Sequence, residues 1–122
     1  MEWACTLTPE IPVTELLARC TLANLPALCA DVYSVEHVTT DGAYAHVGCV
    51  WGEFEMERRP IKNGVRFALI SCPNAFQWSI TSRHGATVVH GSINQMQPDP
   101  EFAESIVDFM QNFCTGLRQT TT

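Results

Sequence analysis

Apolar and polar residues alternate over much of this chain, and a period of two predicts β-strands. Short alternating segments predict one strand at Trp3–Leu7 and another beginning at Asp31. Longer segments of the same kind follow over Ala43–Met56, Val65–Ser71, Phe76–Ser82 and Thr87–Asn94. Asp41-Gly42 and Asn63-Gly64 favour tight hairpins, because the central residues of such turns need positive φ. The middle of the chain is therefore predicted to be an antiparallel meander.

The alternation changes phase inside one of these segments. Up to Trp51 the apolar residues occupy odd positions, whereas beyond Gly52 they occupy even positions, as at Phe54 and Met56. A continuous strand cannot keep one buried face through this change. The pattern predicts a bulge or sharp bend at Trp51-Gly52, and with it a strongly curved sheet.

Helical signals flank the strands. A first helix begins at Thr8-Pro9 or one turn later near Pro12, and Pro26 separates it from a short second helix over 26–30. The last helix has Asp99 as its cap and Pro100 as its first residue. Its apolar residues recur every three or four positions: Phe102, Ile106, Phe109, Phe113 and Leu117. The residues after about position 118 are predicted to fray.

These elements predict a single α+β domain spanning 1–122, a curved antiparallel sheet in β-α-α-β-meander-α order packed against a long C-terminal helix. The layout resembles the helix-grip fold of the START and Bet v 1-like superfamily. The resemblance is carried by Trp3–Leu7 leading into paired short helices, by the meander over 31–94 and by Asp99–Arg118, with no specific motif. It implies an apolar cavity between sheet and helix, although the chain is short for that family. Other helix-on-sheet folds, such as that of TATA-binding protein, fit the same pattern.

The charge of the chain limits the classes of partner that the protein is expected to bind. The net charge of −6 argues against nucleic-acid binding, because such affinity comes mainly from neutralised phosphates. The basic residues Arg58, Arg59, Lys62 and Arg66 surround the second hairpin turn, where we expect them to pair with the acidic side chains of Glu53, Glu55 and Glu57. No stretch reaches the roughly 18 apolar residues of a membrane span, and no secretory signal is visible.

The six cysteines lie far apart in sequence, at positions 5, 20, 29, 49, 72 and 114. Zinc ribbons and redox motifs need closely spaced pairs. We therefore expect a cytoplasmic protein with reduced, mostly buried cysteines, and a disulfide framework is the alternative.

The sequence contains no catalytic or cofactor motif. His37 and His46 could lie on neighbouring strands near Cys49, but His46 and Cys49 are three positions apart and point to opposite faces. Glu53, Glu55 and Glu57 share a face that is expected to be solvated. No metal site and no cofactor are predicted, and the sequence leans against enzymatic activity without excluding it.

The sequence therefore favours a non-catalytic binding protein. A small apolar ligand would lie between the curved sheet and the C-terminal helix, in a pocket lined by aromatic side chains. The predicted lining residues are Trp51, Phe67, Trp78, Phe109 and Phe113. These rings could instead simply fill the core. The alternative function is a protein-interaction or homodimerisation module without a pocket.

Overall fold

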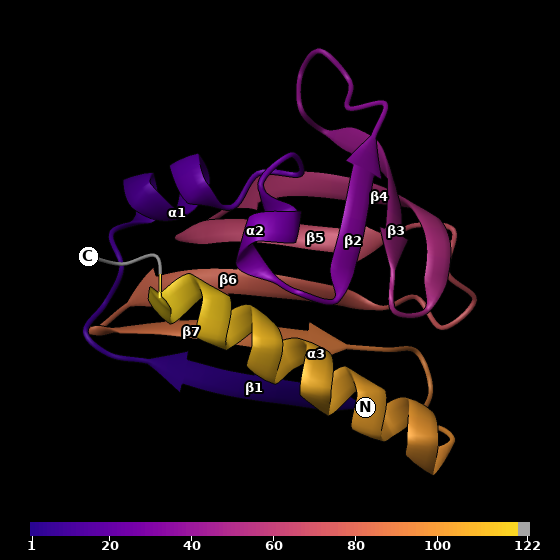
Figure 1. Ribbon diagram of the computed structural model, residues 1–122. Helices are drawn as coiled ribbons and strands as arrows, with labels where there is room; N and C mark the ends of the chain where they lie inside the picture. Colours follow the sequence, from indigo (N-terminus) through magenta and orange to yellow (C-terminus); the bar gives the residue numbers. More distant parts are fainter. Residues whose placement is uncertain (120–122) are drawn as a thin grey trace.

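Seven strands form one antiparallel sheet in the computed structural model, which describes residues 1–119 (Figure 1). The strands are β1 (Glu2–Leu7), β2 (Val32–Glu36), β3 (Tyr44–Cys49), β4 (Gly52–Ile61), β5 (Gly64–Leu69), β6 (Gln77–Arg83) and β7 (Ala86–Ser92). The helices are α1 (Val13–Arg19), α2 (Leu25–Leu28) and α3 (Pro100–Gln119). The predicted α+β architecture is confirmed. Of the end predicted to fray after about residue 118, Gln119 is the last residue of α3, and residues 120–122 lie outside the described residues.

The order of strands across the sheet is β1-β7-β6-β5-β4-β3-β2. Strands β2 to β7 form the expected meander, and β1 joins it beside β7. All three helices lie on the same face of the sheet, with α3 crossing β6, β7 and β1 (Figure 1). We call this covered side the inner face and the opposite side the outer face.

Helix α3 begins and packs as its sequence predicts. The Asp99 carboxylate accepts hydrogen bonds from the backbone N–H groups of Glu101 and Phe102, at 2.8 and 3.3 Å, and so caps the first turn. Along its inner side the helix buries six residues: Ile106, Phe109, Met110, Phe113, Cys114 and Leu117. No helix within residues 1–119 combines the length and hydrophobicity needed to cross a membrane.

Strand register separates the two faces of the sheet. Phe67 lies opposite Trp78, and Trp78 opposite Gly91, in a row across the inner face. In the adjacent row of paired residues, Arg66 lies opposite Ser79, and Ser79 opposite His90. These alternate positions face outward, since neighbouring side chains of a strand point to opposite sides.

Of the two features predicted at Trp51-Gly52, a bulge or a sharp bend, the structure contains a sharp reversal, and the predicted segment Ala43–Met56 is two strands and not one. Strand β3 ends at Cys49 and β4 begins at Gly52, with a tight turn at Val50-Trp51 between them. Gly52 has a φ of +121°, which side-chain-bearing residues rarely adopt. The phase of the apolar pattern changes because one strand ends and another begins there.

Of the two predicted starts of the first helix, the later one near Pro12 is confirmed and the one at Thr8-Pro9 is wrong. In the connection from β1 to α1, the Thr8–Pro9 peptide is cis, Thr8 and Pro9 lie in a bend, and the helix begins at Val13, after Pro12. The backbone N–H of Ile11 donates to Thr87 Oγ1 at 2.8 Å, and this hydroxyl lies 2.6 Å from Ser82 Oγ. These two buried polar side chains hold the connection against the β6–β7 hairpin.

One cysteine pair departs from the expectation that all six cysteines are reduced. Cys5 of β1 and Cys114 of α3 form a disulfide that joins the first strand to the last helix. Cys20, Cys29 and Cys49 are free and buried, as expected, and Cys72 is free and half-buried. Disulfides are characteristic of oxidising compartments, so the cytoplasmic location stays a prediction.

Candidate functional site

The five aromatic residues predicted to line a pocket all meet between the sheet and α3. Phe67 stacks on Trp78, with ring centroids 5.0 Å apart. Trp78 in turn contacts Phe109 at 5.1 Å and Phe113 at 5.8 Å, and Trp51 lies 5.1 Å from Phe109. Strands β5 and β6, the β3–β4 turn and α3 therefore build one aromatic cluster.

This cluster is closely packed. Phe67, Trp78, Phe109 and Phe113 are each at most 1% exposed, and centroid separations near 5–6 Å leave the rings in contact. Phe76, which the sequence did not single out for the site, fills the space between Trp51 and Trp78. The described rings thus occupy the space in which the resemblance to the helix-grip fold implies a cavity.

The two tryptophan indole N–H groups of the cluster differ in their hydrogen bonding. Trp51 is half-buried, and its Nε1 donates to Ser105 Oγ at 2.8 Å, which fastens the β3–β4 turn to α3. Trp78 Nε1 is buried and has no hydrogen-bond partner among residues 1–119. An unpaired buried donor costs about 1–3 kcal/mol, so this group is an unsatisfied polar point within the aromatic cluster.

A hollow lies elsewhere on the inner side of the sheet, between the α1–α2 connection and the β2–β3 loop. Its volume is about 450 Å³, within the usual range for small-molecule sites. It is lined by Leu17, Thr21, Leu22, Ala23, Val38, Thr39, Thr40, Asp41, Gly42 and Arg58, and we call it the Arg58 groove.

Arg58 is the sheet's contribution to this groove. It lies on the inner face of β4, opposite Phe67, and is therefore adjacent to the aromatic cluster. Its Nε donates to the carbonyl oxygen of Cys20 at 2.7 Å, and its Nη2 donates to that of Leu17 at 3.0 Å. The guanidinium has five N–H donors, and no carboxylate of residues 1–119 forms an ion pair with it. A fixed cation is thus left without a counterion beside apolar side chains.

Asp41 supplies a negative charge at the loop side of the groove. Its Oδ1 accepts from Thr39 Oγ1 at 2.6 Å and from the backbone N–H of Ala43 at 3.0 Å. The hydrogen bond from Thr39, followed by that from Ala43, lowers the pKa of the Asp41 carboxyl. The carboxylate is therefore ionised at neutral pH and already committed to the loop's own turn.

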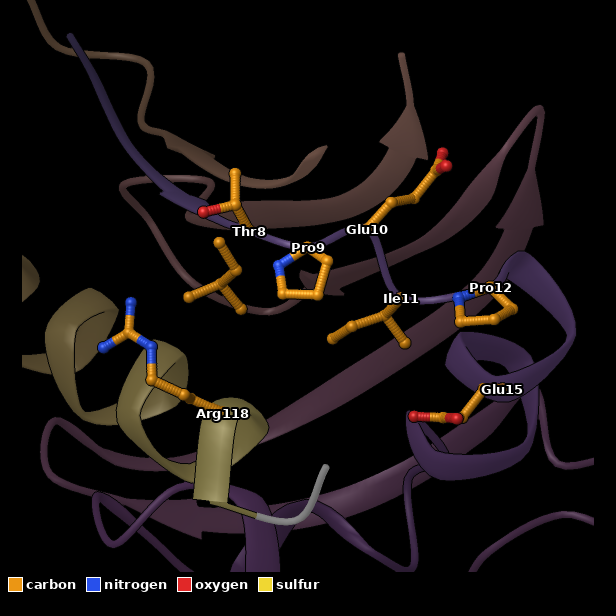
Figure 2. A pocket seen from close by; sticks show the side chains of 8 residues that line it. Thr8, Pro9, Glu10, Ile11, Pro12, Glu15 and Arg118 are labelled. Carbon is orange, nitrogen blue, oxygen red and sulfur yellow. The ribbon is translucent and has the colours of Figure 1, made fainter. Parts of the chain in front are cut away.

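A smaller hollow of about 220 Å³ lies where β1 leads into α1. Figure 2 shows Arg118 of α3 and Glu15 of α1 on opposite sides of Pro9 and Ile11. Glu15 pairs with Arg19 at 2.9 Å, and Arg19 also donates to the Leu117 carbonyl oxygen. These charges hold α1 against α3, and the volume is below the usual ligand range.

The acidic and histidine side chains singled out in the sequence gather on the outer face. The imidazole of His46 lies between Glu55 and Glu53, with Nδ1 2.9 Å from Glu55 Oε1 and Nε2 3.1 Å from Glu53 Oε1. Glu57 accepts from Tyr44 at 3.0 Å and from Arg59 at 2.8 Å. His37 is exposed and separate from them. No group of three metal-binding side chains occurs among the residues that the structure describes.

The free buried thiols are poorly suited to nucleophilic chemistry. Burial raises the pKa of Cys20 to about 11 and that of Cys29 to about 12. Burial also raises the pKa of Cys49. These groups are protonated at neutral pH, whereas the reactive form is the thiolate. They act as small apolar side chains of the core.

Comparisons with known proteins agree with the fold. No protein-family model matches the sequence, and no significantly similar curated protein was found. Among solved structures, the protein XoxI from Bacillus cereus superposes with a TM-score of 0.70 at 13% identity, over 97% of this chain and 93% of that chain. An uncharacterised protein from Bacillus thuringiensis gives 0.61 at 13% identity, over 97% and 94%. A START superfamily protein from Mycobacterium smegmatis gives 0.63 at 12% identity, over 95% and 93%. The chain therefore has the helix-grip architecture of START proteins, as its element order predicts.

Proposed function

We propose that this protein binds a small apolar molecule with an anionic group, without catalysis, on the inner side of its sheet. The observation that carries the proposal is the Arg58 groove: a fixed cation without a counterion beside Leu17, Leu22 and Val38. Specific small-molecule sites commonly combine apolar walls with a few polar groups that orient the ligand. The groove supplies both.

The position of the aromatic cluster also favours ligand binding on the inner face of the sheet. Arg58 lies opposite Phe67, and Phe67 stacks on Trp78, whose Nε1 lacks a partner. A ligand that entered from the groove and displaced side chains of the cluster would meet this donor. The pocket predicted from the sequence, lined by Trp51, Phe67, Trp78, Phe109 and Phe113, stays a proposal that requires these packed rings to move apart.

Fluorescence titration tests the proposal with two matched probes. Anilinonaphthalene sulfonate carries an anionic group, and N-phenylnaphthylamine is its uncharged counterpart. We expect saturable binding of the anionic probe at one site. Arg58→Gln should weaken that binding about tenfold and leave the neutral probe almost unaffected, because a charge-assisted hydrogen bond contributes about 1.5–3 kcal/mol.

A steric variant locates the site. Ala23 is exposed and lines the groove, whereas Ala27 is exposed on α2 and does not. Ala23→Trp should abolish probe binding, and Ala27→Trp should leave it unchanged. Equal binding by both variants would place the site elsewhere. The absence of saturable binding of either probe to the unchanged protein would contradict the proposed function.

A second candidate function, homodimerisation, has one observation in its favour. Strand β2 ends the sheet, and its Tyr33 is 64% exposed. A free edge strand offers unpaired backbone groups to another chain. Sedimentation at high concentration should then show a dimer that Tyr33→Lys disrupts. Met96→Lys, at an exposed apolar residue outside the sheet, should leave it intact. Monomeric behaviour throughout would contradict this function.

A further inference from the structure

The outer face of the sheet contains a polar hollow that is separate from the Arg58 groove. Its volume is about 290 Å³. It is lined on β5, β6 and β7 by Arg66, Gln77, Trp78, Ser79, His90 and Ser92, with Ile61 of β4 at one side. Five of these seven lining residues carry polar side chains, and Ile61 and Trp78 add apolar surface.

Cross-strand register explains why these residues meet. Arg66 lies opposite Ser79, which lies opposite His90, so a guanidinium, a hydroxyl and an imidazole follow one another across three strands. In the next row Gln77 lies opposite Ser92. Opposite residues have Cβ atoms about 4.5–5.5 Å apart, so a single small molecule can reach several of them. The short serine side chains lie between longer ones, which makes the surface concave.

The donors of this hollow are largely unused by the protein. In the part of the chain that the structure describes, Arg66 Nε is buried without a hydrogen-bond partner, and Arg66 Nη2 lies at a long 3.6 Å from Glu57 Oε1. The hydroxyls of Ser79 and Ser92 and the amide of Gln77 make no side-chain hydrogen bond within residues 1–119. His90 Nε2 lies 2.9 Å from Glu2 Oε1, which orients its ring.

We propose that this hollow binds a small soluble phosphate monoester. The guanidinium of Arg66 matches the paired oxygens of a phosphate, and serine hydroxyls and the amide of Gln77 can donate to the remaining oxygens. The volume accommodates a phosphate with a small organic group. A small anion can reach the Arg66 guanidinium inside the hollow, whereas an extended anionic membrane surface would also face the carboxylates of Glu2 and Glu57 and the net charge of −6.

Amide chemical shifts during titration with glycerol phosphate test this proposal. At constant ionic strength we expect saturable shifts centred on β5, β6 and β7, with a dissociation constant in the millimolar range or below, and no such shifts with chloride. Arg66→Gln should weaken binding at least tenfold. Arg83→Gln removes the same charge from the exposed end of β6, outside the hollow, and should change affinity less than twofold.

A second pair of variants covers the case in which Arg66→Gln disturbs the fold. Ser79→Val blocks the hollow while keeping a residue that suits a strand, and Ser34→Val is the matched change on exposed β2. We expect only Ser79→Val to abolish the shifts. Equal affinities in either pair, or no saturation with the unchanged protein, would overturn the proposal. Binding only to phosphatidylcholine vesicles containing phosphatidic acid, and not to glycerol phosphate, would overturn it too.

Discussion

Gly116 shows how a single hydrogen atom in place of a side chain decides packing. It lies within α3, where glycine is normally unfavourable by about 1 kcal/mol relative to alanine. A Cβ at this position would overlap the backbone carbonyl oxygen of Leu28, so α3 approaches the end of α2 at a distance that only glycine allows. The close contact outweighs the poor helix propensity.

We therefore predict that Gly116→Ala lowers the free energy of unfolding, by about 1–3 kcal/mol, as expected for overpacking. Urea denaturation measures the change. Thr115→Ala, at the exposed neighbouring position, is the control and should be neutral or slightly stabilising. A Gly116→Ala protein as stable as the Thr115→Ala protein would show that α2 and α3 are not in this contact.

His46 gives the outer face a pH-dependent contribution to stability. The hydrogen bond to Glu55, followed by that to Glu53, raises the pKa of this imidazole above its ordinary value of about 6.5. A raised pKa in the folded state means that the stabilisation is fully present below pH about 6.5. It is lost as the pH rises through the folded-state pKa.

The prediction is that the stability advantage of the unchanged protein over His46→Gln decreases as the pH rises above about 6.5. Thermal unfolding of both proteins across this range measures the difference. His37→Gln, at an exposed residue in the β2–β3 loop, is the control and should show a smaller dependence. An advantage that grew with pH would contradict the proposed charge pairing.

At the scale of elements, the Cys5–Cys114 disulfide joins parts of the chain that are 109 residues apart in sequence. A link across so long a loop restricts the unfolded chain strongly, and disulfides typically contribute about 2–4 kcal/mol. We predict that Cys5→Ser lowers the free energy of unfolding by about this amount, whereas Cys72→Ser, at a free half-buried cysteine, changes it little. Intact mass under non-reducing conditions checks the link directly, and the mass of a chain with six thiols would contradict it.

Individual helices and strands were easier to predict from the sequence than the contacts between them. The stripe from Phe102 to Leu117 and the Asp99 cap were sufficient for α3, because both are local signals. The hairpin at Val50-Trp51 was predicted only as a bulge or sharp bend within one strand, since a change of phase is common to all three and the sequence lacks the usual hairpin dipeptides there. The disulfide could not be predicted, because its partners meet only when β1 and α3 are packed together.

The candidate site shows the same limit. All five predicted aromatic residues meet, but the sequence could not show how tightly their rings fill the interior. The Arg58 groove was missed although its signal was present. Phe54 and Met56 occupy the inward-facing positions of β4, and Arg58 is the next in that series, so its charge had to point toward the helices. A cation in an apolar series was the sign of a polar group on the inner side.

At the scale of the whole molecule, stability depends on the aromatic cluster that connects the sheet to α3. Phe109 is 1% exposed and contacts Trp51, Phe76 and Trp78. We predict that Phe109→Ala lowers the free energy of unfolding by about 3–5 kcal/mol, through lost burial and the cavity left behind. Denaturant unfolding followed by tryptophan fluorescence measures it.

Phe102→Ala is the control for this prediction. Phe102 is only partly buried and has a ring contact with Trp51 alone, so its loss should be clearly smaller. Equal effects of the two substitutions would contradict the central place of Phe109 in the core.

The pairing of β1 with β7 also has a consequence for how the protein is made. Glu2 is opposite Ser92, so β1 has no partner until β7, about 90 residues later in the chain, has been synthesised. Synthesis at about 5–20 residues per second leaves that strand waiting for several seconds. During this time β1 lacks its neighbour β7, and the phenylalanines of α3 have not yet been made. Closure of the sheet and of its inner face therefore waits until both β7 and α3 have been synthesised.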